Sequence, residues 1–349
     1  MSKQSSDQFP SHFSIDLKSA LRNLKSAILM GAMLLAHCFP AEAQQPKKVP
    51  RIGYVRVVGT PSPPGPNVEA FRRGLRDLGY VEGENIVIEF RYAEGKPDRI
   101  PSLVAELVQL KVDVLISSDG PTIRAAKQAT KTIPIVMVIN QDPVASGLVH
   151  SLAHPGGNIT GISRLTRELS GKRLELLTET VSGISRVGIL WDSTAEGANI
   201  SFKEYQAASR ALKLQLQSLE VRGPNPDLDG AFQSAVKGRA SALITIGNSL
   251  LNRRRKQIAD LAIKHRLPSM YESNQWIEPG GLVSYSSNDA ESYRRAAWIV
   301  DKILKGTKPA DIPVEQPTKF ELVINLKTAK QIGITISQSV LFRADKVIK

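Results

Sequence analysis

The sequence predicts an α/β fold of two similar lobes with parallel sheets, and two observations carry this prediction. Apolar segments of strand length alternate with helical segments of about ten to fifteen residues, which is typical of parallel strands joined by right-handed crossovers. The pattern also starts twice, because RIGYV at 51–55 and RVGIL at 186–190 are both apolar strands that begin with Arg. A TIM barrel shows the same alternation. The repeated start and the Gly/Pro-rich segments near Gly161 and Gly281 favour two lobes in this chain of 349 residues.

The first lobe is expected to cover residues 50–161. In its first helix Val68, Phe71 and Leu75 recur at helical spacing, and Gly79 ends the helix. Pro97 opens a later helix, because proline is tolerated in the first turn. The expected elements, in order, are strand 51–55, helix 67–78, strand 86–90, helix 97–110, strand 112–116, helix 121–130 and strand 133–139.

The second lobe is expected over residues 162–281, and parts of 285–349 are expected to return to each lobe. Segments 160–163 and 282–285 are interpreted as crossings between the lobes, with Gly161 and Gly281 as hinge candidates. The expected elements are helix 168–181, strand 187–191, helix 199–212, strand 214–221, helix 228–237, strand 242–246, helix 250–265, strand 268–271, helix 289–304, strand 320–324 and helix 326–332.

Residues 1–43 are expected to be a signal peptide with an N-terminal extension. A basic region precedes an apolar run at 27–39, and AEA at 41–43 is typical of a signal peptidase site. The apolar run is shorter than the roughly 20 residues that span a membrane. An uncleaved anchor and a lipoprotein attached through Cys38 are the alternatives, although His37 is unsuited to the position before a lipidated cysteine. The sequence therefore predicts a periplasmic protein.

The chain is basic, with a formal net charge of +13. Such a balance fits binding to nucleic acid, attraction to an anionic membrane surface, or simple solubility. The dense cluster RRRK at 253–256 lies inside the predicted helix 250–265, and no aromatic residue interleaves with it. We interpret the cluster as a solvated helix face and expect no nucleic-acid binding.

Candidate ligand-binding side chains follow the predicted strands, because open parallel sheets bind ligands at the carboxyl ends of their strands. The helix that begins after 117–122 offers free backbone N–H groups to an anion, unless Ser118 or Asp119 caps that helix. Trp191 and Tyr285 could stack on a ligand, although core packing is the more common role of an aromatic at a strand end. The candidates are Ser117, Ser118, Asp119, Asn140, Asp142, Trp191, Asp192, Asn248 and Tyr285.

Nothing in the sequence points to catalysis. His150, His154 and His265 are not at metal-ligand spacing, and the chain has no GxSxG, Walker or HExxH motif. We therefore expect no catalytic residue, no metal and no cofactor. A secreted α/β enzyme remains an alternative. A sugar-repressor-like regulator would need an N-terminal helix-turn-helix, where the signal peptide is predicted.

Several long motifs resemble one family, the ABC transporter substrate-binding proteins related to the tryptophan-binding TrpX proteins. The resemblance covers residues 50–349. The motifs are LGYVEGEN at 78–85, AAKQATKTIPI at 125–135, DPVASGLV at 142–149, PGGNITG at 155–161, VDKILKG at 300–306 and PADIPVEQP at 309–317.

This resemblance implies a type I periplasmic binding fold, in which two Rossmann-like lobes are joined by three crossing strands and hold a ligand between them. It also implies capture of a small solute, such as an amino acid or an aromatic solute, for the membrane permease subunits of an ABC importer. A receptor for a sensor system is the alternative, and a monomer is the default. Relatives carry Gly-Thr-Pro before the AAK helix, whereas this chain has Asp119-Gly120-Pro121, so tryptophan is not carried over as the ligand.

Overall fold

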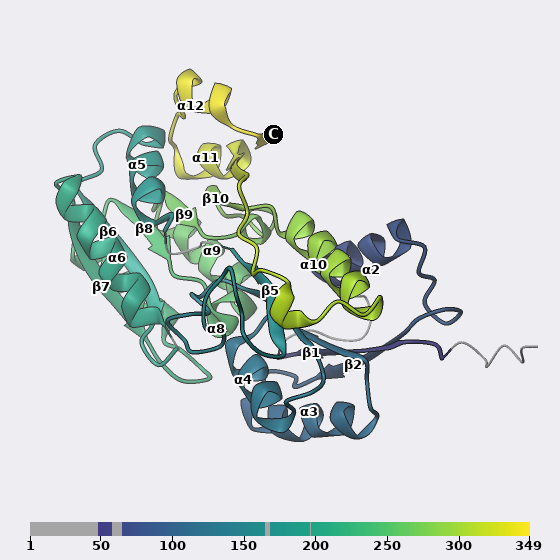
Figure 1. Ribbon diagram of the computed structural model, residues 1–349. Coiled ribbons are helices and arrows are strands. Elements are labelled where there is room, and N and C mark those ends of the chain that lie inside the picture. Colours follow the sequence, from purple (N-terminus) through teal and green to yellow (C-terminus); the bar gives the residue numbers. More distant parts are fainter. Residues whose placement is uncertain (1–47, 58–64, 165–167, 196) are drawn as a thin grey trace, which may run out of the picture. The chain divides into compact units, whose positions relative to one another are not determined.

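The computed structural model describes residues 48–57, 65–164, 168–195 and 197–349. The predicted signal peptide therefore lies outside the described residues. Residues 49–349 contain two β-sheets, each covered by helices (Figure 1). None of the helices in the described ranges is long and apolar enough to cross a membrane.

The first sheet has five parallel strands in the order β2-β1-β3-β4-β5. Ile52 and Tyr54 of β1 point to one face, under helices α2 and α10, while Val55 points to the other, under α3 and α4. This burial of both faces explains the continuous apolar run of β4. The elements are β1 (Arg51–Arg56), α2 (Pro66–Asp77), β2 (Val87–Tyr92), η1 (Pro97–Arg99), α3 (Ile100–Gln109), β3 (Val114–Ser117), α4 (Gly120–Ala129), β4 (Ile135–Ile139), β5 (Ile159–Ser163), α10 (Asp289–Leu304) and η3 (Pro309–Asp311).

The second sheet has the order β12-β11-β10-β9-β8-β6-β7, and its strands are parallel except where β10 meets β11. Val187 and Ile189 of β6 pack with α5 and α6 on one face, and Leu190 packs with α7 and α9 on the other. The elements are α5 (Ser170–Thr180), β6 (Arg186–Asp192), α6 (Ala198–Ala211), β7 (Gln215–Val221), α7 (Leu228–Lys237), β8 (Ala242–Thr245), α8 (Ser249–Arg253), α9 (Arg255–Lys264), β9 (Ser269–Tyr271), η2 (Asn274–Trp276), β10 (Val283–Ser287), β11 (Phe320–Asn325), α11 (Leu326–Ile332), α12 (Gln338–Arg343) and β12 (Lys346–Ile348).

Each sheet with its covering helices is called a lobe below, lobe 1 for the first sheet and lobe 2 for the second. The chain passes from β5 to lobe 2, returns after β10 to form α10 beside α2 (Figure 1), and enters lobe 2 again at β11. Segment 282–285 was expected to cross between the lobes, but β10 pairs with both β9 and β11 and is a strand of the second sheet. The crossing follows Ser287 instead.

The two hinge candidates have different surroundings. Gly161 lies within β5 at φ +140°, and a Cβ at this position would stand 2.1 Å from the carbonyl oxygen of Met137. Gly281 precedes β10 inside lobe 2, where a Cβ would stand 2.5 Å from the carbonyl oxygen of Trp276. Gly161 therefore adjoins a crossing, whereas Gly281 is packed within one lobe.

The predicted helix 250–265 is two helices. Asn248 caps α8 by accepting a hydrogen bond from Leu251 N (2.8 Å), and the chain then bends at Arg254, which has φ −99° and ψ 9°. The bend separates Arg253 on α8 from Arg255 on α9. It places both arginines at the cavity described next rather than on one solvated helix face.

Candidate functional site

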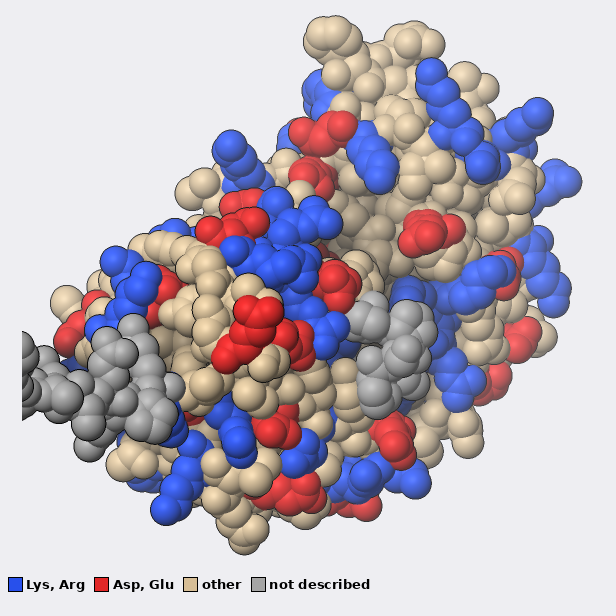
Figure 2. Space-filling model, turned by 90° about the vertical axis from the view of Figure 1, so that its right-hand side faces the viewer, with Lys and Arg blue, Asp and Glu red and all other residues tan. Residues whose placement is uncertain are grey.

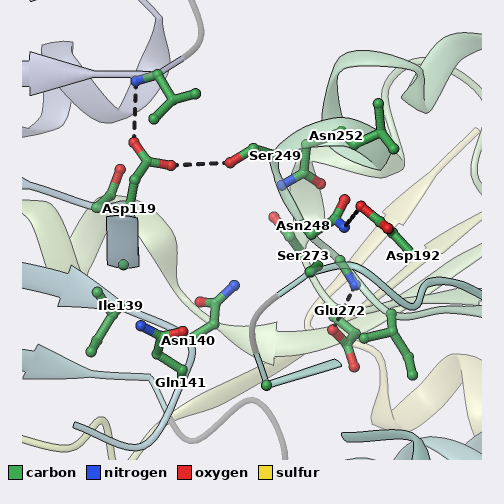
Figure 3. Close-up of a pocket in the computed structure, with 18 of the residues that line it drawn as sticks. Asp119, Ile139, Asn140, Gln141, Asp192, Asn248, Ser249, Asn252, Glu272 and Ser273 are labelled. Atoms are coloured by element: carbon green, nitrogen blue, oxygen red, sulfur yellow. Dashed lines mark hydrogen bonds between the residues drawn. The ribbon is translucent and has the colours of Figure 1, made fainter. Parts of the chain in front are cut away.

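A cavity of about 570 Å³ lies at the carboxyl ends of the strands, between the two lobes. Both lobes contribute to its wall, with Asp119 and Asn140 from lobe 1 and Asp192, Asn248 and Glu272 from lobe 2 (Figure 3). The volume falls within the range of small-molecule sites, which is about 300–1,000 Å³. The position agrees with the rule that open α/β sheets bind ligands beyond the carboxyl ends of their strands.

Asp119 follows β3 and joins the two lobes. Its carboxylate accepts one hydrogen bond from Val57 N (3.3 Å) in lobe 1 and one from Ser249 Oγ (3.2 Å) in lobe 2 (Figure 3). The side chain does not cap α4, so the capping alternative for Asp119 is wrong. Burial raises the pKa of this carboxyl group, and the two hydrogen bonds oppose the shift without cancelling it.

Asp192 and Asn248 support each other on the lobe 2 side. Asp192 Oδ2 accepts a hydrogen bond from Asn248 Nδ2 (3.0 Å), and Oδ1 accepts from the backbone N–H and the hydroxyl of Thr194 (2.9 and 2.6 Å). Asn248 also caps α8. Both side chains are therefore held in fixed orientations at the wall of the cavity.

Glu272 follows β9 and belongs to a buried polar network. One carboxylate oxygen accepts hydrogen bonds from Tyr205 Oη (2.9 Å) and Arg173 Nη1 (3.4 Å), and the other accepts from Gly247 N (2.9 Å). Arg173 has no exposed side-chain surface, and its Nε donates to the carbonyl oxygen of Tyr285 (2.8 Å). Burial raises the pKa of Glu272, while Arg173 opposes the shift. The network therefore holds a carboxylate against the cavity from behind.

Arg164 and Asp289 form an ion pair where the chain changes lobe, since Arg164 follows β5 and Asp289 begins α10. Their side chains are 11% and 13% exposed. Asp289 Oδ2 also accepts from Ser273 Oγ (3.0 Å) and Gln275 Nε2 (3.2 Å). Burial alone would lower the pKa of Arg164, but Asp289 reverses this effect and raises it. The guanidinium group of Arg164 therefore stays charged.

The cavity wall includes Ser118, Asp119, Asn140, Asp192 and Asn248 of the nine candidate ligand-binding residues. These side chains come from four strand ends, those of β3 and β4 in lobe 1 and of β6 and β8 in lobe 2. The sheets bring them together because parallel strands present their carboxyl ends at one edge.

Ser117 and Asp142 were expected to bind the ligand, but their side chains have other roles. Ser117 is buried, and its Oγ accepts a hydrogen bond from the backbone N–H of Asp119 (3.3 Å). Asp142 accepts from the backbone N–H groups of Val144 and Ala145 (2.8 and 3.1 Å), so its carboxylate stabilises its own loop. Neither residue is among the described residues that line the cavity.

The two aromatic candidates also lie apart from the described cavity wall. Trp191 stacks on Phe202 of α6 with 4.7 Å between ring centroids, and its indole N–H bonds Ser218 within the sheet. Tyr285 packs against Phe320 at a separate hollow of about 330 Å³ in lobe 2. Both side chains point away because successive residues of a strand alternate between its faces.

Sequence reasoning missed several polar residues of the wall. Gln141 and Ser249 each stand one residue beyond a candidate, and Glu272 follows the short predicted strand 268–271. Arg253 was assigned to a solvated face. The first three could have been found by extending each strand end by one residue. Arg253 could not, because the bend at Arg254 leaves no clear signal in the sequence.

The described residues contain no group of three or more His, Cys, Asp or Glu side chains that could hold a metal ion. The wall instead offers amides, hydroxyls, carboxylates and arginines. Such a wall suits the binding of a polar small molecule by hydrogen bonds and charge.

The model of one protein family matches residues 60–348, and the family is described as ABC transporter substrate binding protein. The chain is also 26% identical to a tyrosine-binding protein of Clostridioides difficile (strain R20291) over 288 residues, which is 82% of each protein.

Two solved structures share the architecture. An ABC domain from Streptococcus pneumoniae in complex with L-Trp is 25% identical, with a TM-score of 0.78 over 86% of this chain and 99% of that one. The leucine-binding protein LivK from Thermotoga maritima MSB8 is 14% identical, with a TM-score of 0.56 over 81% of this chain and 87% of that one. The second likeness concerns the fold alone.

Proposed function

Because the chain belongs to the ABC transporter substrate binding protein family, we propose that it is an exported receptor of an ABC importer. It captures a small solute between its two lobes and delivers the solute to membrane permease subunits. The family resemblance and the type I periplasmic binding fold expected from the sequence motifs are both confirmed.

The observation that carries this proposal is the cavity walled by both lobes. Polar contacts cross the cleft beside it, including Ser249 Oγ to Asp119 and Gln275 Nε2 to Asn67 Oδ1 (2.9 Å). A solute that contacts both walls stabilises the state in which these contacts are made, and so shifts the balance between open and closed forms. Only the closed form would then dock productively on the permease.

Two further features support the receptor. Two of the relatives named above bind amino acids, tyrosine in one case and L-Trp in the other. Their ligands support a small solute as the ligand of this chain. Residues 1–43 have the pattern of a cleaved signal peptide, which would bring the protein to the periplasm. We expect binding without chemical turnover, by a monomer, and we assign the hinge to the crossings near Gly161 and Ser287.

A thermal-shift screen followed by calorimetric titration tests this function. The purified protein is mixed with amino acids, organic acids, aromatic acids, purines, sugars and short peptides, and a bound solute raises the melting temperature by mass action. We expect one chemical class to give a saturable shift and to be recovered unchanged. Conversion of the solute to a product would contradict the receptor and favour an enzyme.

A matched pair of variants then locates the site. Asp192→Ala removes a wall residue and should weaken binding about tenfold or more, whereas Asp142→Ala, whose carboxylate serves its own loop, should leave the affinity within about twofold. Equal affinities in both variants would argue against the cavity as the binding site.

A further inference from the structure

The carboxylates of the cavity wall already accept hydrogen bonds from other protein groups, whereas two arginines of the wall have no such partner among the described residues. Asp119, Asp192, Glu272 and Asp289 each accept at least two hydrogen bonds from protein groups. In the described part of the chain, Arg56 and Arg253 line the cavity but donate no side-chain hydrogen bond and form no ion pair. The wall therefore has two guanidinium groups with N–H donors to spare, whereas its carboxylate oxygens already accept hydrogen bonds.

Arg253 extends from lobe 2 toward lobe 1. A Cβ on Gly95, in the turn after β2, would stand 3.4 Å from Nη1 of Arg253. This turn is tied to the end of β1, because Ala93 N and Gly95 N donate to the carbonyl oxygens of Arg56 and Val57 (2.9 and 2.7 Å). Arg253 thus approaches the strand end from which Arg56 enters the cavity. Lys and Arg side chains are spread over the face shown in Figure 2, with Asp and Glu side chains between them.

Further donors at the same wall lack acceptors. Gln141 Nε2 and Arg164 Nε are buried atoms without a hydrogen-bond partner in the described residues, and both residues line the cavity (Figure 3 labels Gln141). A buried donor without a hydrogen-bond partner has a cost in free energy, because it has lost its contact with water. A solute that brings acceptor oxygens would remove this cost, whereas an ammonium group would not.

Aromatic surface is scarce at the described wall. Trp276 and Tyr293 are its aromatic residues among those described, and each is only 2% exposed. Tyr271 covers one face of Trp276 at 4.7 Å between ring centroids. An indole or phenol ring would therefore find no open aromatic face to stack on in this part of the chain.

We propose that the solute is an organic acid with net negative charge, such as a dicarboxylate, and that Arg56 and Arg253 bind its carboxylate from opposite lobes. This inference rests on the proposed receptor function and states the chemical class of the solute that the receptor binds. Gln141 and Arg164 supply hydrogen bonds to the remaining oxygens. Because each lobe provides one guanidinium, the anion itself joins the lobes.

Calorimetric titration of the purified protein with matched probes tests the assignment. Succinate, glutarate and L-glutamate carry net negative charge, whereas succinamide, L-glutamine, L-tyrosine and L-tryptophan do not. We expect at least one of the anionic probes to bind, with an affinity at least about tenfold above that of its amide. The affinity should also fall as salt is raised from low to physiological concentration.

Three variants remove one positive charge each. Arg56→Gln and Arg253→Gln should each weaken the anionic probe about tenfold or more. The control is Lys256→Gln, from the same basic cluster, because Lys256 pairs with Asp260 and is not among the described lining residues. It should change the affinity less than about twofold. Unliganded melting temperatures check that all three variants fold.

Several results would overturn the inference. If an anionic probe binds but neither arginine variant weakens it, the assignment of Arg56 and Arg253 is wrong. If tyrosine or tryptophan binds and the anionic probes do not, the substrate class is wrong while the receptor function stands. If no probe of either class binds at millimolar concentration, the inference fails, and the broader screen described above decides the receptor function separately.

Discussion

Asp119 is a buried carboxylate at the meeting point of the lobes, and its raised pKa makes stability depend on pH. Because the folded-state pKa lies above the unfolded value, protonation favours the folded protein. The stabilisation is complete at low pH and is lost as the pH rises through the raised pKa. Asp119→Asn should therefore raise the melting temperature at pH 7 by about 2 °C or more. As the pH rises from about 4 to about 7, the melting temperature of the variant should also fall less than that of the parent protein.

Differential scanning calorimetry across that pH range measures the effect. An asparagine can accept the bond from Val57 N and donate to Ser249 Oγ, so both contacts are kept. Asp142→Asn is the control, because Asp142 accepts its bonds in a solvent-accessible loop. A variant that melts below the parent at pH 7 would contradict this interpretation of Asp119.

The charge of Asp119 destabilises the folded protein, whereas the buried charge of Arg173 is stabilised by its ion pair with Glu272. Arg173→Met leaves Glu272 without its counter-ion and should lower the free energy of unfolding by about 3–5 kcal/mol, as measured by urea titration. The double variant Arg173→Met, Glu272→Gln removes both charges and should recover part of the loss. A single variant with parent-like stability would show that the pair is dispensable.

For individual site residues, the sequence predicted some positions correctly and others wrongly. Asp192 and Asn248 were placed at the cavity because the end of a parallel strand fixes their position. Trp191, one residue earlier on the same strand, points to the opposite face and packs on Phe202. Arg56 and Arg253 were missed, because a long side chain can reach a site from several positions and its direction depends on tertiary packing.

At the scale of the element, β5 depends on one glycine. Gly161 has φ +140° and lies against the backbone of Met137, so any side chain there meets both strain and a clash. Gly161→Ala should lower the free energy of unfolding by about 2 kcal/mol or more. The matched control is Gly157→Ala, where a Cβ would find nothing within 4 Å and should change stability by no more than about 0.5 kcal/mol. Similar urea midpoints for the two variants would contradict this account.

The alternation of strands and helices was predictable because each element carries its own periodicity. The role of β10 was not, because its antiparallel partner β11 follows only after α10 has been completed in lobe 1. The bend between α8 and α9 was missed for a similar reason. Nothing near Arg254 resembles a helix stop, and the apolar spacing continues through it.

At the scale of the whole molecule, the contact of Gln275 with Asn67 helps to hold the lobes together. Gln275→Ala should favour the open form and weaken solute binding about two- to fivefold, chiefly by faster release. Stopped-flow kinetics measures the release rate, and X-ray scattering compares the radius of gyration with and without solute. The control is Gln257→Ala on the exposed surface of α9. Equal release rates in all three proteins would show that this contact does not affect closure.

The return of α10 to lobe 1 has a consequence for the order in which the protein can fold. The apolar face of the first sheet that holds Ile52 and Tyr54 is completed by Ala297 and Val300, which leave the ribosome near the end of synthesis. Until then the part of that face that α2 does not cover stays exposed. Lobe 1 should therefore remain loosely packed, a state suited to passage through an export channel. A chain cut after Ser287 should accordingly be degraded quickly by a dilute protease, while the full chain resists. Resistance of the shortened chain would show that lobe 1 is complete without α10.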